Sequence, residues 1–137
     1  MVIISFDVGE KKIGVAICDK NQVIASPIKI ILNNNNLDAE LKAIFKKYAP
    51  EKILIGNPVN MDGSKSVGKD FIEKFIKKVE NLFPNIPIIL WDERLTSKEA
   101  EEIMIKSDLS RKKRKNKIDM IAAALILRSY LDNINKK

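Results

Sequence analysis

Short apolar runs separated by turn residues dominate the first quarter of the chain. Residues 2–6 and 13–17 are apolar runs of strand length, and the polar segment between them contains Gly9. This pattern predicts a β-hairpin. Residues 23–32 form a third β-rich segment that Pro27 interrupts. Because proline cannot donate a backbone hydrogen bond, it indicates an edge strand or a bulge there.

The middle of the chain alternates between helical and strand patterns. Apolar residues at helical spacing predict a helix over 37–48, and Pro50 follows its expected end. Residues 52–56 are a short buried strand. A longer amphipathic pattern then predicts a helix over 67–82, and residues 86–91 form the fifth strand.

The C-terminal third has two further helical patterns with a basic segment between them. Residues 96–99 (TSKE) have the spacing of a capping box, which should open a helix that carries Ala100, Ile103 and Met104 inward. Residues 107–117 show no apolar periodicity and are expected to form a basic loop. Residues 118–131, rich in Ala, Ile and Leu, predict the last helix.

The order of these elements predicts the fold class. A hairpin meander followed by β-α-β units gives an α/β fold, with one five-stranded mixed sheet and helices on both faces. The length of 137 residues suits a single domain over residues 1–137.

Composition excludes several kinds of chemistry. The chain has no histidine, so a Ser-His-Asp or Cys-His site cannot form. The single cysteine, Cys18, excludes an internal disulfide, and no apolar run approaches the roughly 20 residues of a membrane span. The N-terminus does not have the pattern of a signal peptide, so we expect a cytoplasmic protein that binds no membrane.

Positive charge is concentrated at the C-terminal end. Residues 1–105 contain fifteen Lys/Arg and fifteen Asp/Glu, whereas residues 106–137 contain ten basic and three acidic residues and so carry the whole net charge of +7. A local excess of this kind is typical of a phosphate-binding surface, and equally of a solubilising surface with a charged tail.

Carboxylates follow the strands at positions where a site is expected. Asp7 comes just after the first strand, Asp92 and Glu93 just after the fifth, and Asp119 lies in the first turn of the last predicted helix. Ligands of open α/β sheets gather beyond the carboxyl ends of parallel strands. Clustered carboxylates need a counter-ion, and a hard divalent cation such as Mg²⁺ or Mn²⁺ supplies it. Two such ions about 4 Å apart can activate water and stabilise the leaving oxygen of a phosphodiester.

Each carboxylate also has a structural interpretation. Asp7 can be the first polar residue of a turn, and Asp92 and Glu93 can be solvated residues at a strand end. Asp119 can be an acid near a helix N-terminus behind an Asn116 cap. The sequence alone leaves these alternatives open.

The basic segment lies directly before Asp119, so a phosphate bound there would sit near the proposed metal. This adjacency favours a nucleic-acid substrate over a small phosphate ester. Sparse aromatic residues favour recognition of shape and backbone over base stacking. Arg94 is either a phosphate ligand or an ion-pair partner of Glu93. The candidate nucleic-acid-binding residues are Lys11, Lys12, Arg94, Arg111, Lys112, Lys113, Arg114 and Lys115.

Four segments together resemble one family. Residues 7–16 (DVGEKKIGVA), 56–64 (GNPVNMDGS), 92–96 (DERLT) and 118–127 (IDMIAAALIL) are similar, in this order, to the blocks of the pre-16S rRNA nucleases. This family is also called the Holliday-junction resolvase-like proteins of the YqgF type. The four blocks are spread over the whole chain, which makes the resemblance specific.

The resemblance implies a ribonuclease H-like fold and a cytoplasmic nuclease that matures the 5′ end of 16S rRNA. Carried over by position, Asp7, Glu93 and Asp119 would be the catalytic, metal-binding triad. Glu10 stands where the family often has Thr or Ser, so it is either an extra carboxylate near the metal or only a turn residue. Because the fifth strand is expected to be buried on both faces, its pattern does not decide between Asp92 and Glu93, and Glu93 is favoured.

Three other functions compete with RNA cleavage. A DNA junction resolvase would use the same metal site as a dimer, and the sequence is compatible with a monomer or a weak homodimer. A sugar-kinase or actin-like ATPase would need two such lobes. A binding protein without catalysis would keep the basic segment and make no use of the acids. A structured RNA, pre-16S rRNA, is favoured over DNA junctions.

Overall fold

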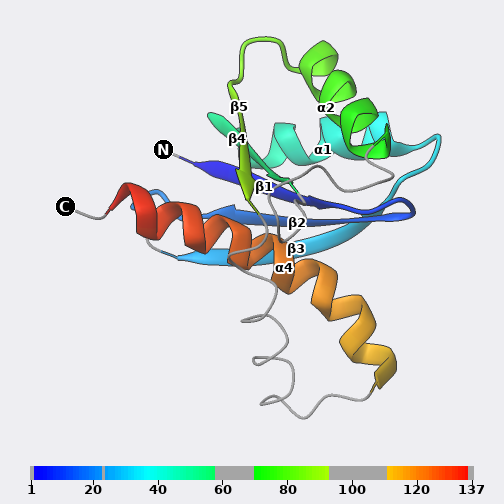
Figure 1. Cartoon of the computed structure of the whole chain (residues 1–137). Coiled ribbons are helices and arrows are strands. Elements are labelled where there is room, and N and C mark those ends of the chain that lie inside the picture. The colour runs from blue at the N-terminus through cyan, green and yellow to red at the C-terminus, as the bar shows by residue number, and fades with distance from the viewer. Residues whose placement is uncertain (1, 23, 58–69, 93–110, 136–137) are drawn as a thin grey trace.

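A five-stranded mixed sheet forms the centre of the computed structural model, which describes residues 2–22, 24–57, 70–92 and 111–135 (Figure 1). The strand order is β3-β2-β1-β4-β5. The first three strands are antiparallel, and β1, β4 and β5 are parallel. The strands are β1 (Ile3–Val8), β2 (Lys12–Cys18), β3 (Ala25–Leu32), β4 (Lys52–Asn57) and β5 (Ile88–Asp92). The predicted five-stranded sheet, a hairpin meander followed by parallel strands, is confirmed.

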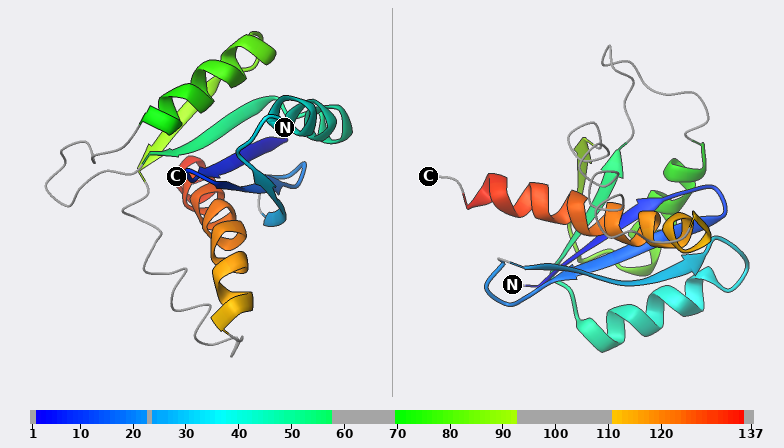
Figure 2. Two further views of the ribbon diagram at one scale, coloured as in Figure 1. Left: turned by 90° about the vertical axis from the view of Figure 1, so that its right-hand side faces the viewer. Right: turned by 90° about the horizontal axis from the view of Figure 1, so that it is seen from below.

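Helices cover both faces of the sheet, as the sequence predicts. α1 (Leu37–Tyr48) and α2 (Asp70–Leu82) lie on one face, and the long α4 (Arg111–Ile134) crosses the other (Figure 2). No helix of the described residues is both long and apolar enough to cross a membrane.

Alternation along β1 divides the core into two layers. Ile4, Phe6 and Val8 belong to the cluster under α1 and α2. The Phe6 ring lies 6.3 Å from that of Phe45 and 5.1 Å from that of Phe75, measured between centroids. Side chains at the alternate positions of β1 face α4. Ile3 packs in a second apolar cluster with residues of α4, and the Ser5 hydroxyl forms a hydrogen bond to that helix.

The proline in β3 lies where the sequence predicts it. β3 is an edge strand, and its pairing with β2 shifts between Val15, which faces Lys29, and Ala16, which faces Pro27. Pro27 therefore adjoins a bulge on an edge strand, where its missing N–H costs little.

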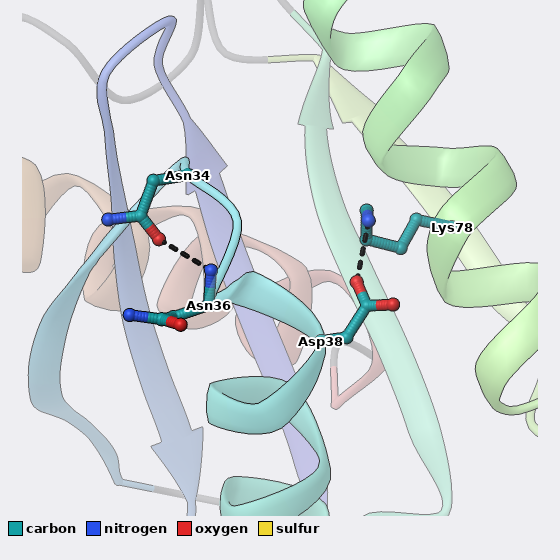
Figure 3. A network of polar contacts seen from close by, with 4 residues as sticks. All are labelled: Asn34, Asn36, Asp38 and Lys78. Atoms are coloured by element: carbon teal, nitrogen blue, oxygen red, sulfur yellow. Dashed lines mark hydrogen bonds and ion pairs between the residues drawn. The ribbon is translucent and has the colours of Figure 1, made fainter.

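Asparagines organise the start of α1. The side chain of Asn34 accepts a hydrogen bond of 2.9 Å from the backbone N–H of Asn36, the N-cap residue (Figure 3). In the first turn of the helix, Asp38 pairs with Lys78 of α2 (Figure 3). At the other end Ala49 adopts a left-handed conformation, with φ 47°, and its N–H bonds to the carbonyl of Phe45. The predicted helix over 37–48 is confirmed.

The predicted start of the last helix, at residue 118, is wrong. α4 begins at Arg111, so residues 111–117 are helical and do not form a loop. Lysine and arginine are strong helix formers, and a helix that extends an already packed segment needs no apolar stripe of its own. Toward its N-terminal end α4 inclines away from the sheet (Figures 1 and 2).

Several strand and helix limits also differ. β1 extends to Val8 and β5 to Asp92, each past its predicted end. α2 is described from Asp70, so the expected start at 67 and the whole helix expected from Thr96 lie outside the described residues.

Candidate functional site

Asp7 lies inside β1, at its carboxyl end. It is the penultimate residue of the strand and is partly buried. The sequence analysis placed it just after the strand, and that detail is wrong, because hairpin pairing continues through Asp7 with Gly14 and Val8 with Ile13. Strand alternation puts Asp7 on the same face as Ile3 and Ser5, the face that α4 covers.

Glycines flank Asp7 on both neighbouring strands. Gly14 of β2 pairs directly with it. On the other side Phe6 pairs with Ile55, so Gly56 is the next position of β4 beside Asp7. Neither neighbour projects a side chain beside the Asp7 carboxylate at this level of the sheet.

α4 runs antiparallel to β1 along this face. The hydroxyl of Ser5 donates a hydrogen bond of 2.7 Å to the carbonyl oxygen of Ala123. Ile3, at the start of β1, shares a cluster with Leu127 and Leu131, which come later in the helix. Residues that come later in β1, from Ser5 to Asp7, therefore lie opposite residues that come earlier in α4.

Position 119 lies one helical turn before Ala123. Four residues of helix span about 6 Å, and positions four apart lie on the same side. Asp119 is thus on the stretch of helix that extends from Ala123 in the direction of the carboxyl end of β1. It is not in the first turn of the helix, and Asn116 does not cap it, because both residues lie within α4.

Trp91 fixes which positions of β5 face α4. The Trp91 indole N–H donates to Ser129 Oγ at 3.1 Å, and its ring packs edge-on against Tyr130, so Trp91 faces α4. Position 92 has the opposite parity. Glu93 lies outside the described residues.

Hydrogen bonds within the β1–β2 turn and from Asn33 stabilise this turn, which follows the end of the strand that carries Asp7. The N–H of Gly9 donates to the Lys12 carbonyl at 2.9 Å. Asn33 donates to this turn twice, through its N–H to the Lys11 carbonyl at 2.9 Å and through its side-chain amide to the Gly9 carbonyl at 3.4 Å. Glu10 and Lys11 are exposed on the turn.

The predicted nucleic-acid-binding residues divide into three groups. Lys11 is exposed next to Asp7, whereas Lys12 is partly buried and already has an interaction partner. Arg94 lies outside the described residues. Arg111, Lys112, Lys113, Arg114 and Lys115 form the first turns of α4, before Asp119 in the same helix.

Asp7, the acid of the proposed site whose side chain is described, is of the type that binds hard divalent cations. Carboxylate oxygen is the ligand that Mg²⁺ prefers, and the chain has no histidine to favour a softer metal. Cys18 is at the opposite end of the β1–β2 pair, where Ile3 N–H donates to its Sγ and burial raises the pKa of the thiol. Within the described residues no three potential ligands cluster, and Glu93 lies outside them.

Solved structures show the same fold. The chain is similar to the Fowlpox virus resolvase in complex with Holliday junction DNA, with a TM-score of 0.62, 22% identity, and coverage of 99% of this chain and 100% of that chain. It is similar to Thermus thermophilus RuvC with a Holliday junction substrate, with a TM-score of 0.58, 11% identity, and coverage of 99% and 97%. The fold is therefore that of the ribonuclease H-like resolvases.

Sequence comparison identifies the family within this class. The family model of RuvX, described as Holliday junction resolvase, matches residues 1–133. A relative from Thermoanaerobacter pseudethanolicus is 44% identical over 100% of both chains, and one from Bacillus subtilis is 40% identical over 98% of this chain and 100% of its own. Both carry the name "Putative pre-16S rRNA nuclease". The chain belongs to the RuvX family, and the resemblance seen in its sequence is confirmed.

Three further residues shape this edge and were not predicted from the sequence. Ser5 lies two positions before Asp7 in β1, and Gly14 and Gly56 flank Asp7 on the neighbouring strands. All three occupy positions on the face of the sheet that α4 covers. Their signal in the sequence was the presence of a polar residue and two glycines inside otherwise apolar strands. Isolated glycine in a strand marks a bulge or a close approach, and buried serine requires a partner.

We predict that Gly9→Ala destabilises the fold. A Cβ at this position would lie 2.6 Å from the backbone oxygen of Lys12, so the hairpin turn must shift. The expected loss is about 1–3 kcal/mol, in the range of overpacking changes, measured as the free energy of unfolding in urea. Glu10→Ala, in the same turn but exposed, is the control and should change stability by less than about 0.5 kcal/mol. Equal stabilities of the two variants would contradict the close approach.

Proposed function

We propose that this protein is a metal-dependent nuclease that cuts structured RNA at the carboxyl edge of its sheet. The observation that carries the proposal is the placement of Asp7 on the face that α4 covers, flanked by glycines, with Asp119 one turn before the Ser5–Ala123 contact. Membership of a family whose relatives are named as pre-16S rRNA nucleases supports the reaction class.

In this proposal Asp7, Glu93 and Asp119 hold Mg²⁺ or Mn²⁺. The parity of β5 supports Glu93 over Asp92, because Trp91 faces α4 and Glu93 follows it by two positions. The bound metal supplies activation of a water nucleophile and stabilisation of the departing oxygen. The protein's part is to fix the carboxylates on the rigid strand β1 and on a helix packed against it.

The first turns of α4 would bind the substrate backbone. Lys115 lies one helical turn before Asp119, and Arg111 lies two turns before it. Basic residues therefore occupy positions on the same side of the helix as Asp119. Lys11 is exposed on the turn beside Asp7 and would add a second contact. Phosphates bound to both elements would bring the scissile bond near the metal.

We favour the 5′ region of pre-16S rRNA as substrate, which places the activity in the cytoplasm. The support is the name shared by relatives that are 40% and 44% identical over nearly their whole lengths. A four-way DNA junction is the second candidate, favoured by the description of the family model and by the junction complexes among structures of the same fold. Resolution of a junction would require a dimer, whereas RNA cleavage needs only a monomer or a weak dimer.

Asp7→Asn should abolish RNA cleavage while leaving the protein folded. The change removes a charged metal ligand and preserves the volume of a partly buried residue outside the apolar core. Cleavage of a labelled 16S precursor fragment is measured with Mg²⁺, with Mn²⁺ and with EDTA, and the melting temperature of each protein is measured alongside. A four-way DNA junction, tested in parallel, decides between the two substrates.

Glu10→Gln is the matched control, because Glu10 is an exposed carboxylate three residues from Asp7. It should retain cleavage. Full activity of Asp7→Asn, or loss of its fold, would contradict the assignment of Asp7. Tight RNA binding by the wild type without cleavage in any metal would favour a non-catalytic binding factor.

Neutralising Arg111, Lys112 and Lys113 to Gln should weaken RNA binding more at low salt than at high salt. Each phosphate contact releases counter-ions, so the logarithm of the binding constant falls linearly with the logarithm of the salt concentration. Losing up to three contacts should reduce the steepness of this line, the salt slope, by up to about three units. The dissociation constant is measured over a range of KCl concentrations.

The control replaces Lys74 and Lys77 of α2 with Gln. Both are exposed lysines on the opposite face of the sheet. This variant should keep the wild-type slope. An unchanged slope in the α4 variant, or an equal reduction in both, would show that α4 is not the binding surface.

A further inference from the structure

Ser5 is a fully buried polar residue on the central strand. Its relative exposure is 0%, and it is the one polar residue among the buried side chains of the described part of the chain. Its hydroxyl donates a hydrogen bond of 2.7 Å to the carbonyl oxygen of Ala123 in α4. The bond joins residues 118 positions apart and links the sheet directly to the helix backbone.

Small residues on both surfaces bring the helix backbone within reach of this hydroxyl. Ser5 pairs with Ala16 of β2, and Ala16 packs with Ala123 and Ala124 in a small buried cluster. In an α-helix the Ala123 carbonyl already accepts a bond from the N–H four residues later. The Ser5 hydroxyl uses the second lone pair, so it is not needed to complete the helix and acts as a tether.

The tether lies two positions from one proposed metal ligand and one helical turn from another. Two residues of strand β1 separate Ser5 from Asp7, about 6.6 Å. Four residues of helix separate Ala123 from Asp119, about 6 Å in the same direction along the sheet. A slide of α4 by one residue would move Asp119 by about 1.5 Å and rotate it by about 100°. The distances and angles between a metal ion and its ligands tolerate only a small part of that displacement.

The other side-chain bonds between α4 and the strands, among the residues that the structure describes, lie farther toward the C-terminal end of the helix. Trp91 donates to Ser129, and the Lys52 ammonium donates to the Tyr130 hydroxyl at 3.3 Å. Toward its N-terminus the helix inclines away from the sheet (Figure 1). Among the described side-chain bonds between α4 and the strands, that of Ser5 is therefore nearest to the point where the helix leaves the sheet.

We propose that Ser5 is a positioning residue that fixes the register of α4 on β1 and thereby holds Asp7 and Asp119 at the spacing a shared divalent metal requires. It touches neither metal nor substrate and acts through the helix backbone. This inference rests on the proposed metal-dependent function and assigns to that site a residue outside the acidic triad.

Ser5→Ala tests the proposal, with Ser129→Ala as the matched control. Each change removes one hydroxyl that links α4 to the sheet, and Ser129 is ten residues beyond Asp119. Mn²⁺ binding to each purified protein is measured directly, by electron paramagnetic resonance of the free ion and by calorimetry. RNA cleavage is then measured as a function of Mg²⁺ concentration.

Ser5→Ala should weaken Mn²⁺ binding about 10-fold or more, the range seen when the residues that orient metal ligands are altered. It should shift the Mg²⁺ dependence of cleavage to higher concentration, with most of kcat recovered at saturating metal. Ser129→Ala should keep wild-type metal affinity, although both variants lose some thermal stability. If Ser5→Ala does not fold, Ser5→Cys supplies the same comparison, because a thiol is a weak donor of similar size.

Wild-type Mn²⁺ affinity in the Ser5 variant would overturn the proposal. Equal weakening in the Ser5 and Ser129 variants would also overturn it, because it would show a general loosening of the helix. Both outcomes leave the proposed nuclease standing. If instead the wild type neither binds Mn²⁺ nor cleaves RNA, the proposed function fails, and the positioning role fails with it.

Discussion

The alternation of side chains along β1 is the constraint on which the rest of the structure depends. One parity supplies Ile4, Phe6 and Val8 to the core under α1 and α2. The other parity supplies Ile3, Ser5 and Asp7 to the face that α4 covers. A shift of one residue in the pairing of this central strand would exchange the two sets, burying a carboxylate in the apolar core. The register of β1 therefore fixes both the core and the position of the proposed ligand.

Much of this arrangement could be predicted because its signals are local. Apolar runs bounded by turns gave the five strands, helical spacing gave α1, and Pro27 marked the bulged edge strand. The start of α4 could not be found in this way. Residues 111–117 have no apolar stripe, and a charged helical extension of a packed helix has the same pattern as a charged loop. The end of β1 was misplaced because an acid in a strand has the same local pattern as an acid in a turn.

The site itself was only partly predictable, since its shape depends on register. Asp7 and Asp119 are visible as acids in the sequence, but their relation depends on the antiparallel course of α4 over β1. The glycines beside Asp7 belong to two different strands, and no local pattern connects them. The preference for Glu93 over Asp92 in the proposed site rests on the orientation of Trp91, which no local sequence pattern reveals and which the bond to Ser129 supplies.

Fold, family and charge support one account of function. The ribonuclease H-like sheet and the RuvX family place the chain among the resolvase-like proteins. In the account proposed here, β1 holds one end of a metal site, α4 holds the other, and the basic turns at the start of α4 guide a nucleic-acid backbone toward it. In this proposal the same helix carries both the metal ligand Asp119 and the basic residues that bind substrate, so its placement on the sheet affects both.

A crystal structure with bound Mn²⁺, located by anomalous scattering, would show whether Asp7, Glu93 and Asp119 share one metal ion. The account predicts an ion at the carboxyl edge of β1, with carboxylate oxygens of Asp7, Glu93 and Asp119 at about 2.1–2.2 Å, close to the Mg²⁺–oxygen distance. An ion bound elsewhere, or one held by Asp7 while Asp119 points away from it, would contradict the account.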